Sequence, residues 1–365
     1  MGSLRLDRVV LRFGSLTVAV ATSDARIQDQ LRSYFRGFAV AKTTARADMV
    51  IEASLEHAQS PRMKLVPWDA RGKESFVDTD RGRLIRKDRT GVVITVEGRR
   101  WSIRGDLHRN FSQLLNLVGT AYGLSLMDLG GAMLHASAVV RSGRALAVIG
   151  QSGSGKSSVA VRLLERGFDF LANDRVIVES NASGVFAHGL PKLPRVNPGT
   201  LLAGKQTRSL IDERSRRRYA RLSPSELWHL EEKYDLDVER ALGRAWTLSA
   251  PFACAFVLNW RLGGGDLVIQ QLEPGQAFDA IQTATKSFGP FDLKLSRRSD
   301  RALRSLARSV PVYRVTGAQD PSALAAEIAR RRWARVPSHS NGRVRKITVT
   351  PQERVVSKCR SPRVR

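Results

Sequence analysis

The chain has 365 residues, of which 42% are hydrophobic, and a formal net charge of +26. This length suffices for about two domains with apolar cores. No run reaches the roughly eighteen apolar residues of a membrane span, and the amino end lacks the apolar core of a signal peptide, so we expect a cytoplasmic protein without a transmembrane segment. Cys254 and Cys359 lie far apart, which argues against a disulfide framework or a cysteine metal site.

The positive charge is concentrated near the carboxyl end. From Arg330 to Arg365 the chain has twelve Arg and Lys residues against one acid, Glu353. Such a balance is typical of proteins that bind nucleic acid, a membrane surface or an acidic partner. A GC-rich genome also enriches exposed arginines without any binding role. Nucleic acid therefore stays open as a partner but is not favoured.

Residues 1–125 have the pattern of a small α/β domain. Gly14-Ser15 separates two runs of alternating apolar residues, which predicts paired strands over 4–20. Apolar residues at helical spacing predict helices at 27–35 and 111–126. Further strands are expected at 48–55, 75–78, 83–87 and 92–96. No catalytic motif falls in this part of the sequence.

Residues 126–335 have a different pattern. Apolar strands are expected at 133–140 and 145–150, and the second leads directly into a glycine-rich loop and a helix at 157–166. Later strands are expected at 168–172, 176–179, 252–260 and 267–272, and later helices at 223–234 and 322–334. Residues 336–365 have few apolar anchors and many charges, so a basic, disordered tail is expected.

The loop after the strand at 145–150 carries the most specific motif of the chain. Gly150-Gln151-Ser152-Gly153-Ser154-Gly155-Lys156-Ser157 fits G-x-x-x-x-G-K-[ST], the P-loop or Walker A pattern. Its glycines allow backbone N–H groups to point at phosphate oxygens, and the following helix adds its positive end. The residues expected to bind the nucleotide are Gly150, Gln151, Ser152, Gly153, Ser154, Gly155, Lys156, Ser157 and Ser158. The predicted cofactors are therefore ATP and Mg²⁺.

A magnesium site beside a bound triphosphate requires a carboxylate close to the γ-phosphate. Asp174 is the best candidate because it follows the strand expected at 168–172, a helix-and-back distance from the loop. Lys156 is expected to neutralise the β- and γ-phosphates, and Ser157 and Asp174 to ligate Mg²⁺. The alternative is that Asn173-Asp174 only forms a turn. The signature Leu-Ser-Gly-Gly-Gln of ABC ATPases and the Asn-Lys-x-Asp motif of small GTPases are both absent, which argues against these two classes.

Three sequence segments together resemble HPr kinase/phosphorylase. They are Leu134-His135-Ala136-Ser137-Ala138-Val139, the loop 150–157, and Gly167-Phe168-Asp169-Phe170-Leu171-Ala172-Asn173-Asp174. Two more segments, 189–200 and 227–235, resemble HPr-kinase-related bacterial proteins of subgroups A and B. The resemblance covers residues 130–270. It implies an α/β fold in which a P-loop kinase domain of the HPr kinase/phosphoenolpyruvate carboxykinase type follows a smaller amino-terminal α/β domain.

The resemblance also implies roles for individual residues. Asp174 matches the acid that takes the proton from the acceptor hydroxyl, and His135 matches the active-site histidine of the family. Arg195 and Arg244 are candidates for clamping the transferred phosphate, since a guanidinium fits phosphate oxygens. The alternatives are a half-buried histidine at a strand end and ordinary surface arginines.

The chain departs from the family pattern at two points. Asn173 stands where the family has the first Asp of a pair, and no acidic magnesium ligand is found near 187–189. Kinase chemistry is therefore expected rather than the reverse phosphorylase reaction. The amino-terminal 125 residues do not match the family's own first domain.

The leading hypothesis is an ATP- and Mg²⁺-dependent kinase that transfers the γ-phosphate to a hydroxyl, such as that of Ser, on a small protein or peptide. The basic surface would favour an acidic acceptor. One alternative is a nucleotide-gated binding or regulatory protein without phosphotransfer, and another is a small-molecule kinase of the same fold. The resemblance leaves a homo-oligomer open, because related proteins assemble.

Overall fold

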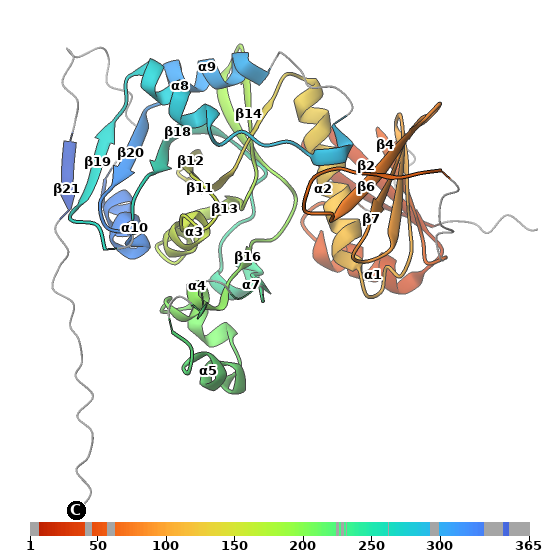
Figure 1. The fold of residues 1–365 in the computed structure, drawn as a ribbon, viewed down its shortest axis with the longest axis horizontal. Helices are drawn as coiled ribbons and strands as arrows, with labels where there is room; N and C mark the ends of the chain where they lie inside the picture. Colours follow the sequence, from red (N-terminus) through yellow and green to blue (C-terminus); the bar gives the residue numbers. More distant parts are fainter. Residues whose placement is uncertain are drawn as a thin grey trace, which may run out of the picture.

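The computed structural model describes residues 7–40, 46–56, 63–223, 226–227, 230, 232–261, 263–292, 299–331 and 346–349. Within them the chain forms two large β-sheets, each packed against helices, and a lobe of short helices below the second sheet (Figure 1). The fold is therefore mixed α/β, as the sequence predicts. No helix in these residues is both long enough and apolar enough to cross a membrane.

The first sheet is built entirely from the amino-terminal part of the chain. Its strands are β1 (Asp7–Phe13), β2 (Leu16–Thr22), β3 (Ala39–Val40), β4 (Met49–Ser54), β5 (Val66–Pro67), β6 (Glu74–Thr79), β7 (Gly82–Lys87), β8 (Val92–Glu97) and β9 (Arg100–Arg104). Their order is β3-β1-β2-β4-β9-β8-β7-β6-β5. Only the pairs β2–β4 and β4–β9 are parallel. The predicted strands at 48–55, 75–78, 83–87 and 92–96 are confirmed as β4, β6, β7 and β8.

Two helices, α1 (Ala25–Tyr34) and α2 (Phe111–Asp128), cover one face of this sheet (Figure 1). The carboxylate of Asp24 begins α1 by accepting a hydrogen bond from the N–H of Ile27. Along α2 the buried side chains include Leu114, Val118 and Tyr122, the spacing from which the helix was predicted. α2 ends three residues beyond the expected boundary between the two parts of the chain at residue 125.

The second sheet contains the strand that leads into the glycine-rich loop. Its strands are β10 (Ala132–Leu134), β11 (Ala136–Arg141), β12 (Arg144–Ile149), β13 (Asp169–Ala172), β14 (Val176–Asn181), β15 (Gly184–Gly189), β18 (Ser249–Leu258), β19 (Leu267–Gln271), β20 (Val312–Thr316) and β21 (Lys346–Val349). The main order is β10-β14-β15-β18-β12-β11-β13, and β20, β19 and β21 extend it from β18. Ser142 and Gly143 both have positive φ, which matches the two-residue turn joining β11 to β12.

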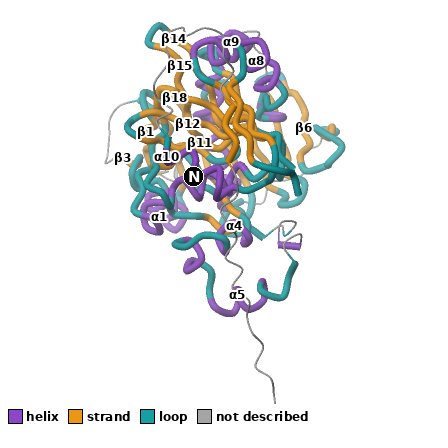
Figure 2. Tube along the Cα trace, turned by 90° about the vertical axis from the view of Figure 1, so that its left-hand side faces the viewer, coloured by secondary structure: helices purple, strands orange, loops and turns teal. Residues whose placement is uncertain are grey.

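Helices cover both faces of the second sheet. α3 (Lys156–Leu164) and α10 (Pro321–Arg330) pack together on one face, while α8 (Pro274–Gln282) and α9 (Ser299–Ser309) lie on the other, near β14 and β15 (Figures 1 and 2). Alternate residues of β12 point into the two apolar cores, one on each face of the sheet. Leu146 and Val148 belong to the α3–α10 core, whereas Ala147 and Ile149 belong to the α8–α9 core. A strand buried on both faces reads as a continuous apolar run.

In the lobe between β15 and β18 the described residues form short elements. They are β16 (Arg195–Val196), α4 (Pro198–Leu202), a 3-10 turn η1 (Thr207–Leu210), α5 (Glu213–Tyr219), β17 (Tyr234–Asp235) and α7 (Val238–Leu242). Part of the helix expected at 223–234 lies outside the described residues. Its predicted capping box is present: the N–H of Glu226 donates to Ser223 Oγ, and the N–H of Ser223 donates to the Glu226 carboxylate.

The two sheets share part of one apolar core. Phe288 and Phe291, around the 3-10 turn η2 (Gly289–Phe291), pack with residues of α2 and of the first sheet. The ring of Phe291 stacks on Trp101 of β9 with centroids 6.1 Å apart. A Cβ on Gly123 of α2 would lie 2.2 Å from Phe288 Cζ, so this close approach requires glycine. The second part of the chain therefore completes the core of the first.

The structure corrects the expected disorder of residues 336–365 at one place. Lys346–Val349 forms β21, which runs antiparallel to β19 at the edge of the second sheet. The physical reason is local: the apolar residues Ile347 and Val349 alternate with the polar residues Lys346 and Thr348, and three of the four are β-branched, a pattern that suits an edge strand. Residues 332–345 and 350–365 lie outside the described residues.

Candidate active site

The glycine-rich loop connects the end of β12 to the start of α3, as the sequence predicts. Gly153 and Gly155 have φ values of +80° and +86°, where other L-residues are strained. A Cβ on Gly150 would lie 2.7 Å from Ser154 Oγ. Trp260 Nε1 holds the loop from β18's side by donating to the carbonyl of Ser154, at 2.7 Å. The loop is thus a tight backbone cradle at the amino end of a helix.

Two polar groups of the loop suit an incoming anion. The hydroxyl of Ser154 is buried and has no hydrogen-bond partner among the described residues. The Lys156 ammonium is folded over the loop, donating to the Gln151 carbonyl at 2.7 Å. Burial lowers the pKa of Lys156 to about 8, with Asp174 opposing this shift and Lys286 reinforcing it. These features fit a phosphate group, which would accept from the hydroxyl and compensate the lysine's charge.

Lys156, His135 and Asp174 form a continuous polar chain across the site. Lys156 Nζ lies 2.9 Å from His135 Nε2, and His135 Nδ1 lies 3.1 Å from Asp174 Oδ1. The carboxylate oxygen can only accept, so Nδ1 carries a proton, and the ammonium can only donate, so Nε2 has a free lone pair. In this arrangement Nδ1 donates to Asp174 and Nε2 accepts from Lys156. The structure thus brings together the three residues that the sequence singled out for catalysis.

Asp174 is held by an unusual backbone conformation and by cations. Its φ is +75°, directly after β13 and Asn173. The Lys286 ammonium lies 3.5 Å from its Oδ1, and Arg175 Nε lies 3.8 Å from its Oδ2. Burial alone would raise the pKa of Asp174, but the hydrogen bond from His135 and the charge of Lys286 outweigh it, so the pKa lies well below its usual range. Asp174 is therefore ionised at neutral pH.

Asn173, beside Asp174, connects the loop helix to β11. Its Oδ1 accepts hydrogen bonds from Ser157 Oγ at 2.8 Å and from Ser137 Oγ at 2.9 Å. Its Nδ2 faces the Arg195 carbonyl at 3.4 Å. Hydroxyl and amide oxygens suit Mg²⁺, which also keeps several waters and phosphate oxygens as ligands. No cluster of three His, Cys, Asp or Glu able to hold a metal occurs among the described residues.

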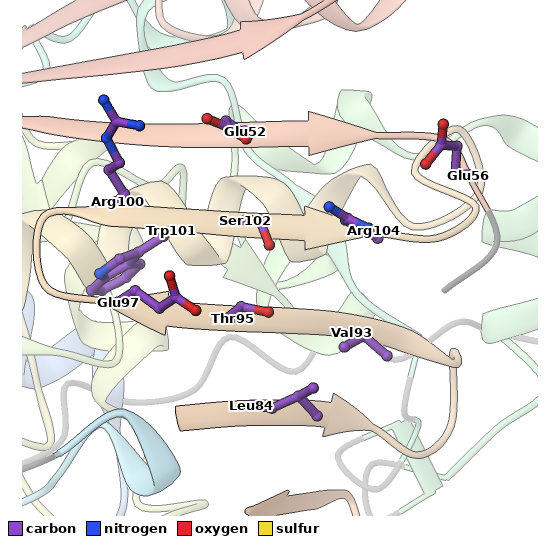
Figure 3. A pocket seen from close by; sticks show the side chains of 10 residues that line it. All are labelled: Glu52, Glu56, Leu84, Val93, Thr95, Glu97, Arg100, Trp101, Ser102 and Arg104. Carbon is purple, nitrogen blue, oxygen red and sulfur yellow. The ribbon is translucent and has the colours of Figure 1, made fainter. Parts of the chain in front are cut away.

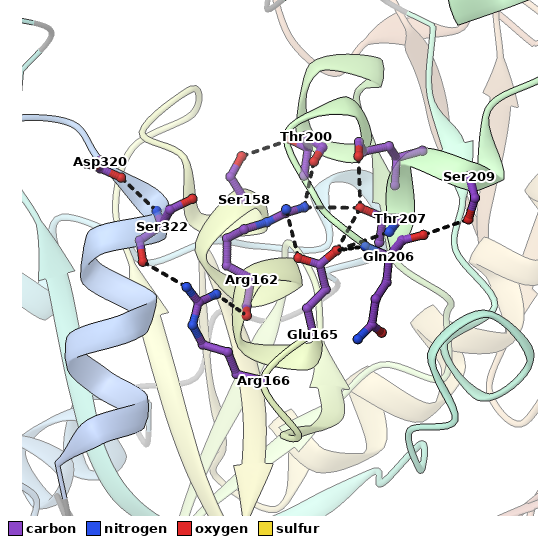
Figure 4. A network of polar contacts seen from close by, with 11 residues as sticks. Ser158, Arg162, Glu165, Arg166, Thr200, Gln206, Thr207, Ser209, Asp320 and Ser322 are labelled. Atoms are coloured by element: carbon purple, nitrogen blue, oxygen red, sulfur yellow. Dashed lines mark hydrogen bonds and ion pairs between the residues drawn. The ribbon is translucent and has the colours of Figure 1, made fainter. Parts of the chain in front are cut away.

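Three residues named from the sequence have other surroundings than expected. The hydroxyl of Ser158 is 2.9 Å from Thr200 Oγ1, so the lobe rather than the loop engages it (Figure 4). Arg195 is exposed and pairs with Asp235 at 3.1 Å. Arg244 does not reach the loop, which corrects its expected role as a clamp. Its guanidinium lies beside Gly167, past the far end of the nine-residue helix α3, roughly 12 Å from that helix's start.

Sequence reasoning missed Lys286, Lys192 and the bridging amide of Asn173. Lys286 sits in a segment that runs beside β10: its N–H donates to the Met133 carbonyl, and the His135 N–H donates to the Ala284 carbonyl. No local motif marks it. Lys192 could have been noticed, because it is the one charge in the apolar stretch Gly189-Leu190-Pro191-Lys192-Leu193-Pro194.

A buried network ties α3 to the lobe (Figure 4). The Arg162 guanidinium pairs with Glu165 at 2.8 Å and donates to the Thr200 carbonyl at 2.8 Å and Thr207 Oγ1 at 3.2 Å. Only 5% of the Arg162 side chain and 8% of the Glu165 side chain are exposed. The network anchors α4 and η1 against the helix that begins at the loop.

An open groove of about 670 Å³ lies elsewhere, on the first sheet (Figure 3). It is lined by β4, β9, β8 and β7, with charges of both signs from Glu52, Glu97, Arg100 and Arg104. These four side chains are exposed, and no ion pair joins them in the described part of the chain. Trp101 is only 4% exposed, so its ring offers no stacking surface. The groove contains none of the predicted site residues.

Comparisons with known proteins leave the family open. No protein-family model matches the chain, and no curated protein matches it. Among solved structures, the Hpr(Ser) kinase/phosphatase from Coxiella burnetii is similar over 54% of this chain and 91% of that chain, at 12% sequence identity and a TM-score of 0.26. A likeness this weak carries no argument about function, which must come from the site itself.

Proposed function

We propose that the chain is an ATP- and Mg²⁺-dependent phosphotransferase that acts on a hydroxyl, such as that of Ser, of a small protein or peptide. The observation that carries the proposal is the polar chain from the loop to a carboxylate: Lys156 to His135 at 2.9 Å, and His135 to Asp174 at 3.1 Å. A nucleotide-binding lysine and an ionised acid joined through one imidazole are the groups that phosphoryl transfer requires.

The loop and α3 would bind the triphosphate. The N–H groups of 150–157 and the positive end of α3 would face the phosphates, with the unpartnered Ser154 hydroxyl as a further donor. Lys156 would exchange its bond to the Gln151 carbonyl for phosphate oxygens. Ser157 and Asn173 supply oxygen atoms that fit Mg²⁺. Once bound, that ion supplies positive charge to neutralise the phosphates.

Asp174 would act as the base. The acceptor oxygen forms a bond to the γ-phosphorus, the bond from that phosphorus to the β,γ-bridging oxygen breaks, and ADP departs with the electron pair. The acceptor proton goes to the Asp174 carboxylate. A weak base suffices because the transition state is loose and little negative charge develops on the acceptor. His135 orients Asp174 through its Nδ1–H and holds Lys156 through Nε2.

The surroundings of Asp174 favour the role of base over that of metal ligand. Its two oxygens already face His135, Lys286 and Arg175, and a bound cation would have to compete with these groups. Within the described chain, the oxygens of Ser157 and Asn173 are hydrogen-bonded only to neutral hydroxyl and amide groups, so a cation there would displace hydrogen bonds but would meet no positive charge. We therefore assign the metal to the side of the loop and the proton transfer to Asp174.

Incubation with γ-labelled ATP and Mg²⁺ tests the proposed function. Hydroxyl-bearing peptides and a cell lysate would serve as acceptors, and the Lys156→Met variant as the control. Label that enters a protein or peptide only with the wild type supports the kinase. Tight binding of ATP without transfer to any acceptor would reject it in favour of a nucleotide-gated binding protein.

A further inference from the structure

Lys192 is a largely buried cation without a carboxylate partner. Its Nζ donates to Asn116 Oδ1 of α2 at 2.6 Å, and no ion pair involves it among the described residues. Burial lowers the pKa of Lys192 to about 8, with Arg195 and Arg175 acting in the same direction and Asp235 and Asp174 opposing them. A buried charge compensated only by an amide costs folding free energy. Such a cost is expected where function requires the charge.

Two other cations lie beside the carboxylate of Asp174. Arg175 and Lys286 both lie within 4 Å of Asp174, at 3.8 and 3.5 Å. The Arg175 guanidinium is also fixed over the Phe288 ring, 5.4 Å from its centroid. Asp174 thus already interacts with two cations and with His135, so it cannot neutralise Lys192 as well. The surroundings of the proposed base carry an excess of positive charge.

The triphosphate does not account for this excess. The contacts of Lys192 and its neighbours are with α1 and α2: the Leu193 N–H donates to Tyr34 Oη at 2.8 Å, and Leu190 lies against Gly119 and Gly123. Among the described residues, no hydrogen bond or ion pair joins the Lys192 side chain to residues 150–158. The loop has its own cation in Lys156. The pairing of Val176 with Gly189 brings the segment of Lys192 next to that of Asp174 and Arg175, and Lys192 has no hydrogen bond to the loop.

We propose that Lys192, Arg175 and Lys286 form an anion-binding subsite beside Asp174 that takes the carboxylates flanking the accepting hydroxyl of an acidic peptide segment. The identification of the occupant as the acceptor rests on the proposed function. A carboxylate next to the hydroxyl would compensate Lys192, free Asp174 from part of its cationic surroundings, and set the hydroxyl against the base.

Binding of a designed peptide pair tests the subsite without catalysis. One fluorescein-labelled peptide carries aspartates on both sides of a single serine, and its partner carries asparagines instead. Anisotropy titrations of the full chain without nucleotide should give about tenfold tighter binding of the aspartate peptide at low salt. Lys192→Met and Lys286→Met should each lose most of this preference. Lys205→Met, an exposed lysine in the lobe, should keep it.

Folding is followed separately by urea denaturation of every variant. Because Met removes an uncompensated buried charge, Lys192→Met should be folded and no less stable than the wild type. Lys286→Met changes a half-exposed side chain and gives a second, independent variant. Lost preference in a stable protein cannot then be attributed to misfolding.

Equal affinities of the two peptides for the wild type would overturn the subsite. A preference for the aspartate peptide that survives in both Lys192→Met and Lys286→Met would also overturn it. If the affinity for ATP fell in these variants as much as the affinity for the peptide, the cations would belong to the nucleotide site, and the subsite would again be overturned. Displacement of the aspartate peptide by a much lower concentration of a single-stranded oligonucleotide would also overturn it, in favour of nucleic acid. A protein that prefers the aspartate peptide but never transfers phosphate rejects only the proposed function. Equal transfer to both peptides rejects only the subsite.

Discussion

The two sheets of this protein use charged side chains in opposite ways. On the first sheet, Glu97 and Arg100 line a wide groove, but they are exposed and form no ion pair with each other or with the rest of the described chain (Figure 3). At the second sheet, the mostly buried Lys156 and His135 are joined to the half-exposed Asp174 by contacts of about 3 Å. The groove on the first sheet thus contains none of the three residues that are joined at the candidate site.

The difference follows from topology. The groove lies across the middle of neighbouring strands, where side chains stand apart and water screens each charge. The candidate site lies where β12 ends in a loop and where the segments after β10 and β13 reach the same point. Strand ends can bring several side chains and free backbone N–H groups to one place. The predictions below test this contrast, each with a control from the first sheet or from the surface.

The largest expected effect is on nucleotide binding. Lys156→Met should weaken ATP binding by about a hundredfold or more, because it removes the charge that would face the β- and γ-phosphates. Arg100→Met in the groove should change ATP affinity less than twofold, although it also removes one positive charge. Calorimetric titration of both variants measures this. Comparable losses of ATP affinity in the two variants would mean that the groove takes part in nucleotide binding, which would contradict the proposed difference between the two sheets.

The next effect is on stability. Arg162→Met should lower the free energy of unfolding by about 3 kcal/mol, because it leaves Glu165 buried without its partner (Figure 4). Replacing both Arg162 and Glu165 by Met should recover much of the loss. Arg32→Met, which breaks an exposed pair with Asp29 beside the first sheet, should cost less than about 0.5 kcal/mol. Urea denaturation gives all three values, and similar costs for the two single variants would contradict the buried network.

The smallest effect concerns Lys192 and depends on pH. Its pKa is about 8 in the folded chain, below the 10.5 of an ordinary lysine, so between these values the unfolded chain binds more protons than the folded one. Raising the pH through this window therefore stabilises the wild type. Lys192→Met should be more stable than the wild type by about 1 to 2 kcal/mol at pH 7, and this advantage should shrink toward pH 10.5.

Urea denaturation at pH 7, 9 and 10 follows the Lys192 effect, with Lys205→Met as the matched control. The free energy of unfolding of Lys205→Met should change with pH in the same way as that of the wild type. An advantage of Lys192→Met that is independent of pH would show that packing rather than charge is responsible.

The sequence predicted the framework of the site better than its surroundings. An apolar strand, a glycine-rich loop and a helix are readable because the apolar run of β12 and the glycines of the loop are local signals. The proximity of His135, Lys156 and Asp174 followed from a resemblance to known kinases, and the structure brings these residues together. Their catalytic roles stay a proposal.

What could not be predicted depends on contacts between distant segments. Lys286 reaches Asp174 only because residues 284–286 run beside β10, more than a hundred residues earlier in the sequence. Arg244 was one of two candidates for clamping the phosphate, with an ordinary surface arginine as the alternative, and the path of the chain after α7 places it near Gly167. The helices α8 and α9 were missed, although Leu303 and Leu306 of α9 recur at helical spacing.

The most direct test of the account is phosphate transfer by Asp174→Asn. Label from γ-labelled ATP would be followed into an acceptor for the wild type, for this variant and for Glu97→Gln from the groove, with ATP affinity measured for each. We expect Asp174→Asn to bind ATP within about twofold of the wild type but to lose transfer by about a hundredfold or more, while Glu97→Gln behaves as the wild type. Undiminished transfer by Asp174→Asn would contradict the assignment of the base and, with it, the proposed active site.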